Sequence, residues 1–142
     1  MTPQEDYHKF LRTIGKTEAE VQGIMASLPE PVFNSALDQW FEINLSEING
    51  LGVFARTPIE SGRVFMACGP LGRTILARYV NHSSQPNLVL HPGSDELSKH
   101  LFAESSREIR EGEEVTFDYL DNMIKQGYSL PEPDGQLEMF SE

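Results

Sequence analysis

The sequence predicts a β-rich α+β fold, with several small sheets preceded by a helical N-terminal extension. Up to about residue 42, apolar residues recur with helical spacing. From about residue 43 to 125, short β-type runs alternate with Gly, Pro and Asp turns, and no alternating strand–helix–strand units occur. The 142 residues suffice for one compact domain. We therefore expect a helical extension at 1–42, a β-rich domain at 43–125 and an acidic tail at 126–142.

The helical extension contains two clear helix start signals. The segment Thr2–Glu5 combines a capping box with proline at the first helical position. Thr17 and Glu20 form a second capping box. Each precedes an apolar stripe, which indicates a packing surface. The apolar residues between Val32 and Phe41 predict a third helix.

The β-rich domain contains several predicted strands separated by turns. These strands are Gly52–Arg56, Arg63–Cys68, Asn87–His91, His100–Glu104 and Val115–Tyr119. Between the second and the third, Arg73–Val80 predicts one or two helical turns. The carboxylates Glu111, Glu113 and Glu114 surround Gly112, which predicts an exposed turn.

Composition limits the partners and the location of this protein. The formal net charge is −11, which opposes binding to nucleic acid and anionic membranes and favours basic protein or peptide partners. The alternative is that the acidic surface only promotes solubility. The single cysteine, Cys68, excludes an internal disulfide and a multi-cysteine zinc site, and the four histidines lack metal-ligand spacing, so we expect no metal. Without a run of about 20 apolar residues or a secretory pattern, we expect an intracellular protein, cytoplasmic or, in a eukaryote, nuclear.

Three segments of the β-rich part carry recognisable motifs. They are NGLGVFA at Asn49–Ala55, RYVNHSSQPN at Arg78–Asn87, and GEEVTFDY at Gly112–Tyr119. In this order they resemble the signature of SET-domain protein lysine methyltransferases, in a minimal form similar to compact viral or bacterial members. The resemblance covers about residues 46–121. It implies a SET-type fold of several small sheets with a knotted C-terminal segment, in which the segments carrying Asn81 and Tyr119 thread past one another.

The resemblance also implies a binding site for S-adenosylmethionine as cofactor. The residues that would line it are Gly50, Leu51, Gly52, Arg78, Tyr79, Asn81 and His82. Glycines allow a backbone to approach a ligand closely, and Asn and His side chains offer directional donors and acceptors to an amino-acid moiety or an adenine edge. The alternatives are a tight hairpin at 50–52 and, for Asn81 and His82, an internal network that joins two loops.

The chemistry implied is transfer of a methyl group to the amine of a lysine side chain in a protein substrate. An unperturbed lysine has a pKa of about 10.4, so its ammonium must lose a proton before attack, and a phenol can orient the neutral amine. The resemblance assigns this catalytic role to Tyr119. Phe117, two residues earlier, would share a strand face and the substrate channel with Tyr119. Phenylalanine there resembles the permissive form of a product-specificity switch, which implies di- or trimethylation; the alternative is an ordinary core residue.

One departure from the family pattern leaves other functions open. Only 28 residues separate Gly52 from Asn81, where most relatives have a longer insert that forms one wall of the substrate groove. We expect the N-terminal helices, or the second subunit of a homodimer, to supply that wall. The alternatives are a non-catalytic SET-fold module that binds a basic peptide or partner protein, and a purely structural role in an assembly.

The tail contains a further motif. Gln136–Phe140 (QLEMF) resembles the peptide that docks bacterial proteins onto the replicative sliding clamp. The alternative is that Met139 or Phe140 folds back over the cofactor.

Overall fold

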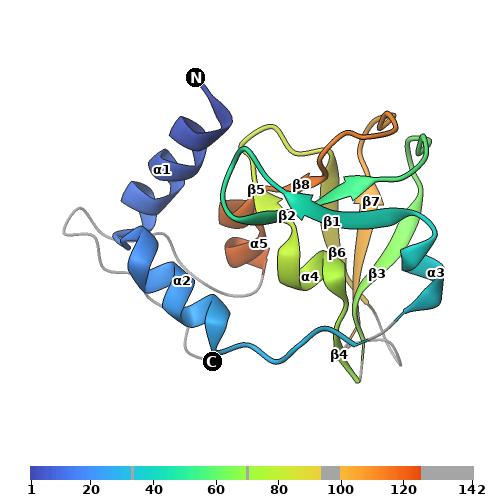
Figure 1. The fold of residues 1–142 in the computed structure, drawn as a ribbon, viewed down its shortest axis with the longest axis horizontal. Coiled ribbons are helices and arrows are strands. Elements are labelled where there is room, and N and C mark those ends of the chain that lie inside the picture. The colour runs from blue at the N-terminus through green and yellow to red at the C-terminus, as the bar shows by residue number, and fades with distance from the viewer. Residues whose placement is uncertain (33, 70, 94–99, 126–142) are drawn as a thin grey trace.

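The computed structural model describes residues 1–32, 34–69, 71–93 and 100–125. Two helices lie to one side of a group of small sheets (Figure 1). In chain order the elements are α1 (Pro3–Ile14), α2 (Glu18–Ala26), α3 (Ser35–Asp38), β1 (Phe41–Leu45), β2 (Leu51–Ala55), β3 (Val64–Gly69), β4 (Gly72–Arg73), α4 (Ile75–Tyr79), β5 (Asn81–His82), β6 (Leu88–Pro92), β7 (Leu101–Ser105), β8 (Thr116–Phe117) and α5 (Tyr119–Lys125). The tail motif at 136–140 lies outside the described residues.

Both predicted N-terminal helices form, but they are held differently. The capping boxes at Thr2 and Thr17 are both present, and Gly15 ends α1 with a φ of 69°. The apolar face of α1 is buried and packs near Ile48 and the apolar residues of α5. In contrast, no residue of α2 is buried. Helix α1 is therefore anchored to the domain, whereas α2 rests against it.

The predicted third helix is mostly wrong. Helix α3 has four residues, beginning where the Asn34 side chain accepts hydrogen bonds from the backbone N–H groups of residues 36 and 37. Phe41 instead opens strand β1, which pairs with β2 in antiparallel register from Phe41↔Ala55 to Leu45↔Leu51. Because Leu37 and Phe41 both reach the main core, their spacing imitates a helical stripe although the backbone changes conformation between them.

The strands form three sheets. Strands β1 and β2 make a hairpin, β4, β3, β7 and β6 make a four-stranded sheet in that order, and β5 pairs with β8. Each predicted strand segment overlaps an observed strand, and α4 lies within the predicted helical segment. Strands β1, β4 and β5 were not predicted. Fully buried apolar side chains between these elements form the main core, the largest being Phe41, Ile59, Leu76, Leu88 and Ile109.

The last predicted strand is too long. Strand β8 covers only Thr116–Phe117, and Tyr119 begins α5. The carboxylate of Asp118 accepts hydrogen bonds from the N–H groups of Leu120 (3.0 Å) and Asp121 (3.2 Å), which favours a helix start at this point. Phe117 and Tyr119 therefore do not share a strand face: Phe117 is a buried member of the main core, whereas Tyr119 is the first residue of the helix and packs against that core only in part.

The parallel pair β5–β8 brings two of the three motifs side by side. Asn81 lies opposite Thr116, and His82 opposite Phe117. In Figure 1, α5 lies next to this pair, and it follows β8 directly in the chain. Residues far apart in the sequence are thus joined at one place, although the threading of one segment past the other stays a prediction.

Candidate functional site

Asn81 is the junction of the three motifs. Its side-chain amide donates to the backbone carbonyls of Asn49 and Leu51, both at 3.0 Å, and to the Glu114 carboxylate at 3.1 Å. The side chain is buried, with 7% of the residue exposed. Its hydrogen bonds therefore hold the first and third motifs together, as in the internal network that the sequence left as an alternative.

The two glycines of the first motif have different roles. Gly50 has a φ of 47°, a left-handed conformation that glycine tolerates best, and the space where its side chain would lie is open. Gly52 instead faces the Glu114 carboxylate and the side chain of Ser46, so closely that an added Cβ would collide with the carboxylate. Gly52 is required by protein packing, and Gly50 by the shape of a turn.

Glu114 is a half-buried carboxylate at the same junction. Besides the Asn81 amide, it accepts hydrogen bonds from the Ser46 hydroxyl at 2.9 and 2.8 Å. Burial raises the pKa of Glu114, while the hydrogen bonds from Asn81 and Ser46 act in the opposite direction. The prediction of a wholly exposed carboxylate turn is therefore wrong for Glu114, because this side chain turns inward under the hairpin.

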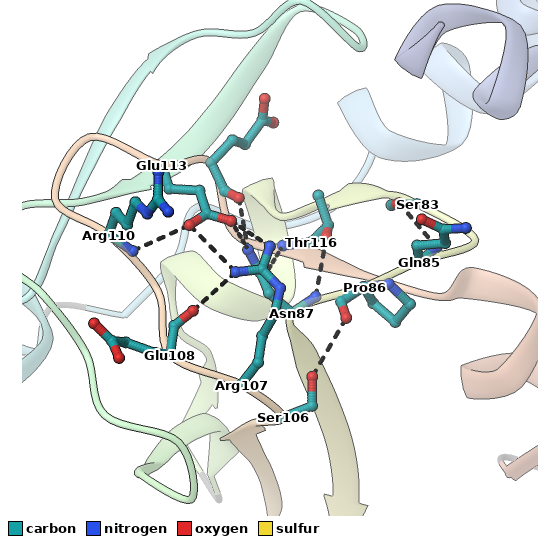
Figure 2. A network of polar contacts seen from close by, with 11 residues as sticks. Ser83, Gln85, Pro86, Asn87, Ser106, Arg107, Glu108, Arg110, Glu113 and Thr116 are labelled. Atoms are coloured by element: carbon teal, nitrogen blue, oxygen red, sulfur yellow. Dashed lines mark hydrogen bonds and ion pairs between the residues drawn. The ribbon is translucent and has the colours of Figure 1, made fainter. Parts of the chain in front are cut away.

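Glu113 is also tied into the protein. Figure 2 shows its carboxylate among the side chains of Arg107 and Asn87 and the backbone N–H of Arg110. The hydrogen bond from Arg107 is the main reason that the pKa of Glu113 is lowered. The buried Asn87 amide also donates to the Glu114 carbonyl at 2.9 Å, and its oxygen accepts from the Thr116 N–H at 2.8 Å. The end of the second motif therefore fastens the third in place.

The Tyr119 ring packs against the rings of Phe10 and His82. Its hydroxyl donates a hydrogen bond to the carbonyl of Val80, immediately before Asn81. Its ring packs edge-on against Phe10 of α1, with 5.3 Å between the ring centroids. Burial, with smaller contributions from Tyr7 and Glu114, raises the pKa of Tyr119 well above its ordinary value. Tyr119 is thus a neutral phenol whose oxygen retains lone pairs that can accept a hydrogen bond.

His82 faces the N-terminal helix. Its Nδ1 accepts the backbone N–H of Tyr119 at 3.0 Å, and its ring stacks on Phe10 with 4.6 Å between centroids. Burial lowers the pKa of His82, although Asp118 and Asp6 oppose that shift. The side chain of His82 is therefore a neutral acceptor that positions Tyr119.

A cavity of about 270 Å³ gathers most of the predicted site residues. From the predicted set, its lining contains Gly50, Leu51, Arg78, Tyr79, Asn81 and Tyr119. Gly52, His82 and Phe117 do not line it. Helices α1 and α2 supply five further lining residues, none of which the sequence analysis assigned to the cofactor site, namely Tyr7, Val21, Gln22, Met25 and Ala26. Their helical stripes could not distinguish a cavity wall from a core face.

Arg78 provides the positive charge of this cavity. Its guanidinium lies over the Tyr79 ring, 4.7 Å from the centroid, and its buried Nε has no hydrogen-bond partner among the described residues. A buried donor without a partner is costly, so a ligand acceptor at this position would be favoured. An acidic ligand group is therefore the natural complement of Arg78.

A second, larger groove of about 780 Å³ is lined by Phe10 and His82, neither of which lines the first cavity. Asp6, Glu47 and Asp118 are among its acidic lining residues. Within the described ranges, no group of three or more His, Cys, Asp or Glu side chains could hold a metal ion. No helix of the same ranges is long and apolar enough to cross a bilayer.

Comparison with known proteins agrees with this arrangement. Residues 68–120 match the family model of the SET domain. The match includes the whole of the second and third motifs, whereas the first motif lies before it. Residues 68–120 are therefore similar to a SET domain, and this match confirms the resemblance to the SET-domain family that the motifs predicted. A solved structure from Plasmodium falciparum, described as a candidate histone methyltransferase, matches 57% of this chain and 93% of its own, with 19% identity and a TM-score of 0.47.

Proposed function

We propose that this protein is an S-adenosylmethionine-dependent protein-lysine N-methyltransferase. The observation that carries the proposal is the 270 Å³ cavity, on which residues of the first and second motifs and Tyr119 of the third converge. Such a concave site with a few polar groups is typical of small-molecule binding. The SET domain match makes methyl transfer the reaction to test first.

The lining residues suit the proposed cofactor. Arg78 has a buried donor with no partner in the described part of the chain, and this donor suits the carboxylate of an amino-acid moiety. The open space at Gly50 leaves the first motif's backbone accessible to a ligand. When bound, S-adenosylmethionine would supply a methyl group on a positively charged sulfur. The residues proposed to hold it are Gly50, Leu51, Arg78, Tyr79 and Asn81. Gly52 and His82 do not line the cavity but position residues around it, since Gly52 packs against Glu114 and His82 accepts the Tyr119 N–H.

Tyr119 is proposed to orient the lysine amine. Its hydroxyl hydrogen is used by the Val80 carbonyl, so the oxygen can accept an N–H from the amine and direct the nitrogen lone pair. Because the pKa of Tyr119 is strongly raised, the phenol stays protonated at neutral pH and cannot act as the base. The apolar surroundings favour the neutral form of an entering lysine instead.

The substrate is proposed to be a basic, lysine-containing segment of a protein. The net charge of −11 and the acidic lining of the larger groove would attract such a segment. This attraction should weaken with added salt, since exposed charges more than about 10 Å apart are screened at 0.1 M ionic strength.

Two measurements test the proposal. Isothermal titration with S-adenosylmethionine checks the cavity without needing a substrate. Radiolabelled methyl transfer to lysine-rich protein fractions then checks the reaction, with Tyr119→Phe beside the wild type. Cofactor binding with labelling lost in the variant would support the proposal. Binding without any labelling by the wild type would favour the non-catalytic module, and no binding at all would refute the assigned site.

A further inference from the structure

Helix α2 presents one face to the candidate cavity. Val21, Gln22, Met25 and Ala26 line it. These positions follow one another at the spacing of a single helical face. On the other side of α2, Ile24 is 55% exposed. Val21 and Met25, which are half-buried, and the exposed Gln22 and Ala26 therefore form one face of α2 along the cavity.

This face is poorly satisfied by the protein itself. None of the residues of α2 is buried, and only Val21 packs at the edge of the second core cluster. A helix of nine residues is marginal in water unless its apolar face is covered. Helix α1 is anchored by four buried residues, and Gly15, in a left-handed conformation, begins the short link to α2. Helix α2 is therefore held over the cavity mainly by its connection to α1. A ligand that filled the cavity would complete its packing.

The two walls of the cavity differ in chemistry. The wall from α4 and β5 carries the Arg78 charge and the Asn81 amide, whereas the α2 wall is apolar except for the Gln22 amide. An adenosine group has flat apolar faces and a hydrogen-bonding edge, and a methionine thioether packs well on aromatic rings. The charged amino-acid moiety suits the first wall, and the nucleoside suits the second.

We infer that α2 is part of the ligand-binding site and contacts the adenosine portion of S-adenosylmethionine through Met25 and Gln22. The inference rests on the proposed cofactor and adds residues outside the SET domain match. It assigns the N-terminal extension to recognition of the cofactor, where the sequence suggested a wall for the substrate.

The test compares three single variants by isothermal titration with S-adenosylmethionine. Met25→Ala should weaken binding about tenfold, since it removes apolar contact area from the ligand. Gln22→Ala should weaken it about threefold to tenfold by deleting a hydrogen bond. Ile24→Ala is the matched control, because it shortens an apolar side chain of the same helix on the exposed side, and its affinity should stay within about twofold. Alanine is the best helix former, so none of these changes should melt α2.

A second measurement separates ligand contact from a structural effect. Addition of S-adenosylmethionine to the wild type should slow hydrogen exchange of the backbone amides in α2, and less so in Met25→Ala. If the wild type binds but Met25→Ala and Gln22→Ala bind as tightly as Ile24→Ala, the inference is wrong while the proposed cofactor stands. If the wild type itself does not bind, the proposed cofactor is wrong and the inference falls with it.

Discussion

Replacement of Asn81 by alanine should destabilise the protein as well as weaken cofactor binding. The Asn81 amide has two hydrogens for three acceptors, so at any moment it makes about two hydrogen bonds. One neutral bond is worth about 1 kcal/mol and one to a charged carboxylate about 1.5–3 kcal/mol. We expect Asn81→Ala to lower the free energy of unfolding by about 3 kcal/mol, which leaves most domains folded. Asn44→Ala, an exposed asparagine of β1, is the matched control and should change it by less than about 0.5 kcal/mol.

The loss from Asn81→Ala should also depend on pH through Glu114. A carboxyl group whose folded pKa is raised contributes stability below its unfolded pKa, and that contribution is lost as the pH rises through the folded pKa. Since the Asn81 amide stabilises the charged form, its removal raises the pKa of Glu114 further and deepens the loss at high pH. Urea unfolding followed by circular dichroism at about pH 8 and about pH 5 should therefore give the larger deficit at about pH 8. A deficit below about 1 kcal/mol, or one equal at both pH values, would refute the reasoning.

Three other predictions follow from the same site. Tyr119→Phe should reduce methyl-transfer turnover about a hundredfold or more, and unchanged turnover would remove Tyr119 from catalysis. The same change should lower Tm by about 2–8 °C in a thermal melt, because the Val80 carbonyl loses its hydrogen-bond donor. Gly52→Ala should cost about 1–3 kcal/mol in urea unfolding because its Cβ meets the Glu114 carboxylate, and a Gly52→Ala protein as stable as the wild type would contradict the packing role. Because the pKa of His82 is lowered in the folded protein, the unfolded chain binds more protons than the folded one near this pH. The free energy of unfolding should therefore fall as the pH drops below about 6.5, and it should fall less in His82→Gln. Equal pH curves of stability for the two proteins would contradict this prediction.

Local sequence signals determined the parts of the fold whose cause is local. Helices α1 and α2 begin at the capping boxes of Thr2 and Thr17, and α1 ends at Gly15. These signals can be recognised in the sequence because their hydrogen bonds join residues only a few positions apart. Short β-type runs also located the longer strands, because the apolar pattern of each run indicates a strand without knowledge of the strand that pairs with it. The motifs also indicated the similarity to the SET domain, because residue types and their order along the chain can be compared without knowing the contacts in the fold.

Tertiary structure alone decided what each motif residue does. The sequence could not distinguish Gly50 from Gly52, because the difference is a carboxylate that arrives from a segment more than sixty residues away. It placed Phe117 and Tyr119 on one strand face, whereas the Asp118 hydrogen bonds start a helix between them. It treated the stripe of α2 as packing surface, although that face covers a cavity. For Gly52 and for α2 the deciding contact joins residues distant in the chain, whereas the Asp118 hydrogen bonds are local contacts that hydrophobic periodicity does not register. Hydrophobic periodicity records that a side chain is shielded from water without recording what shields it.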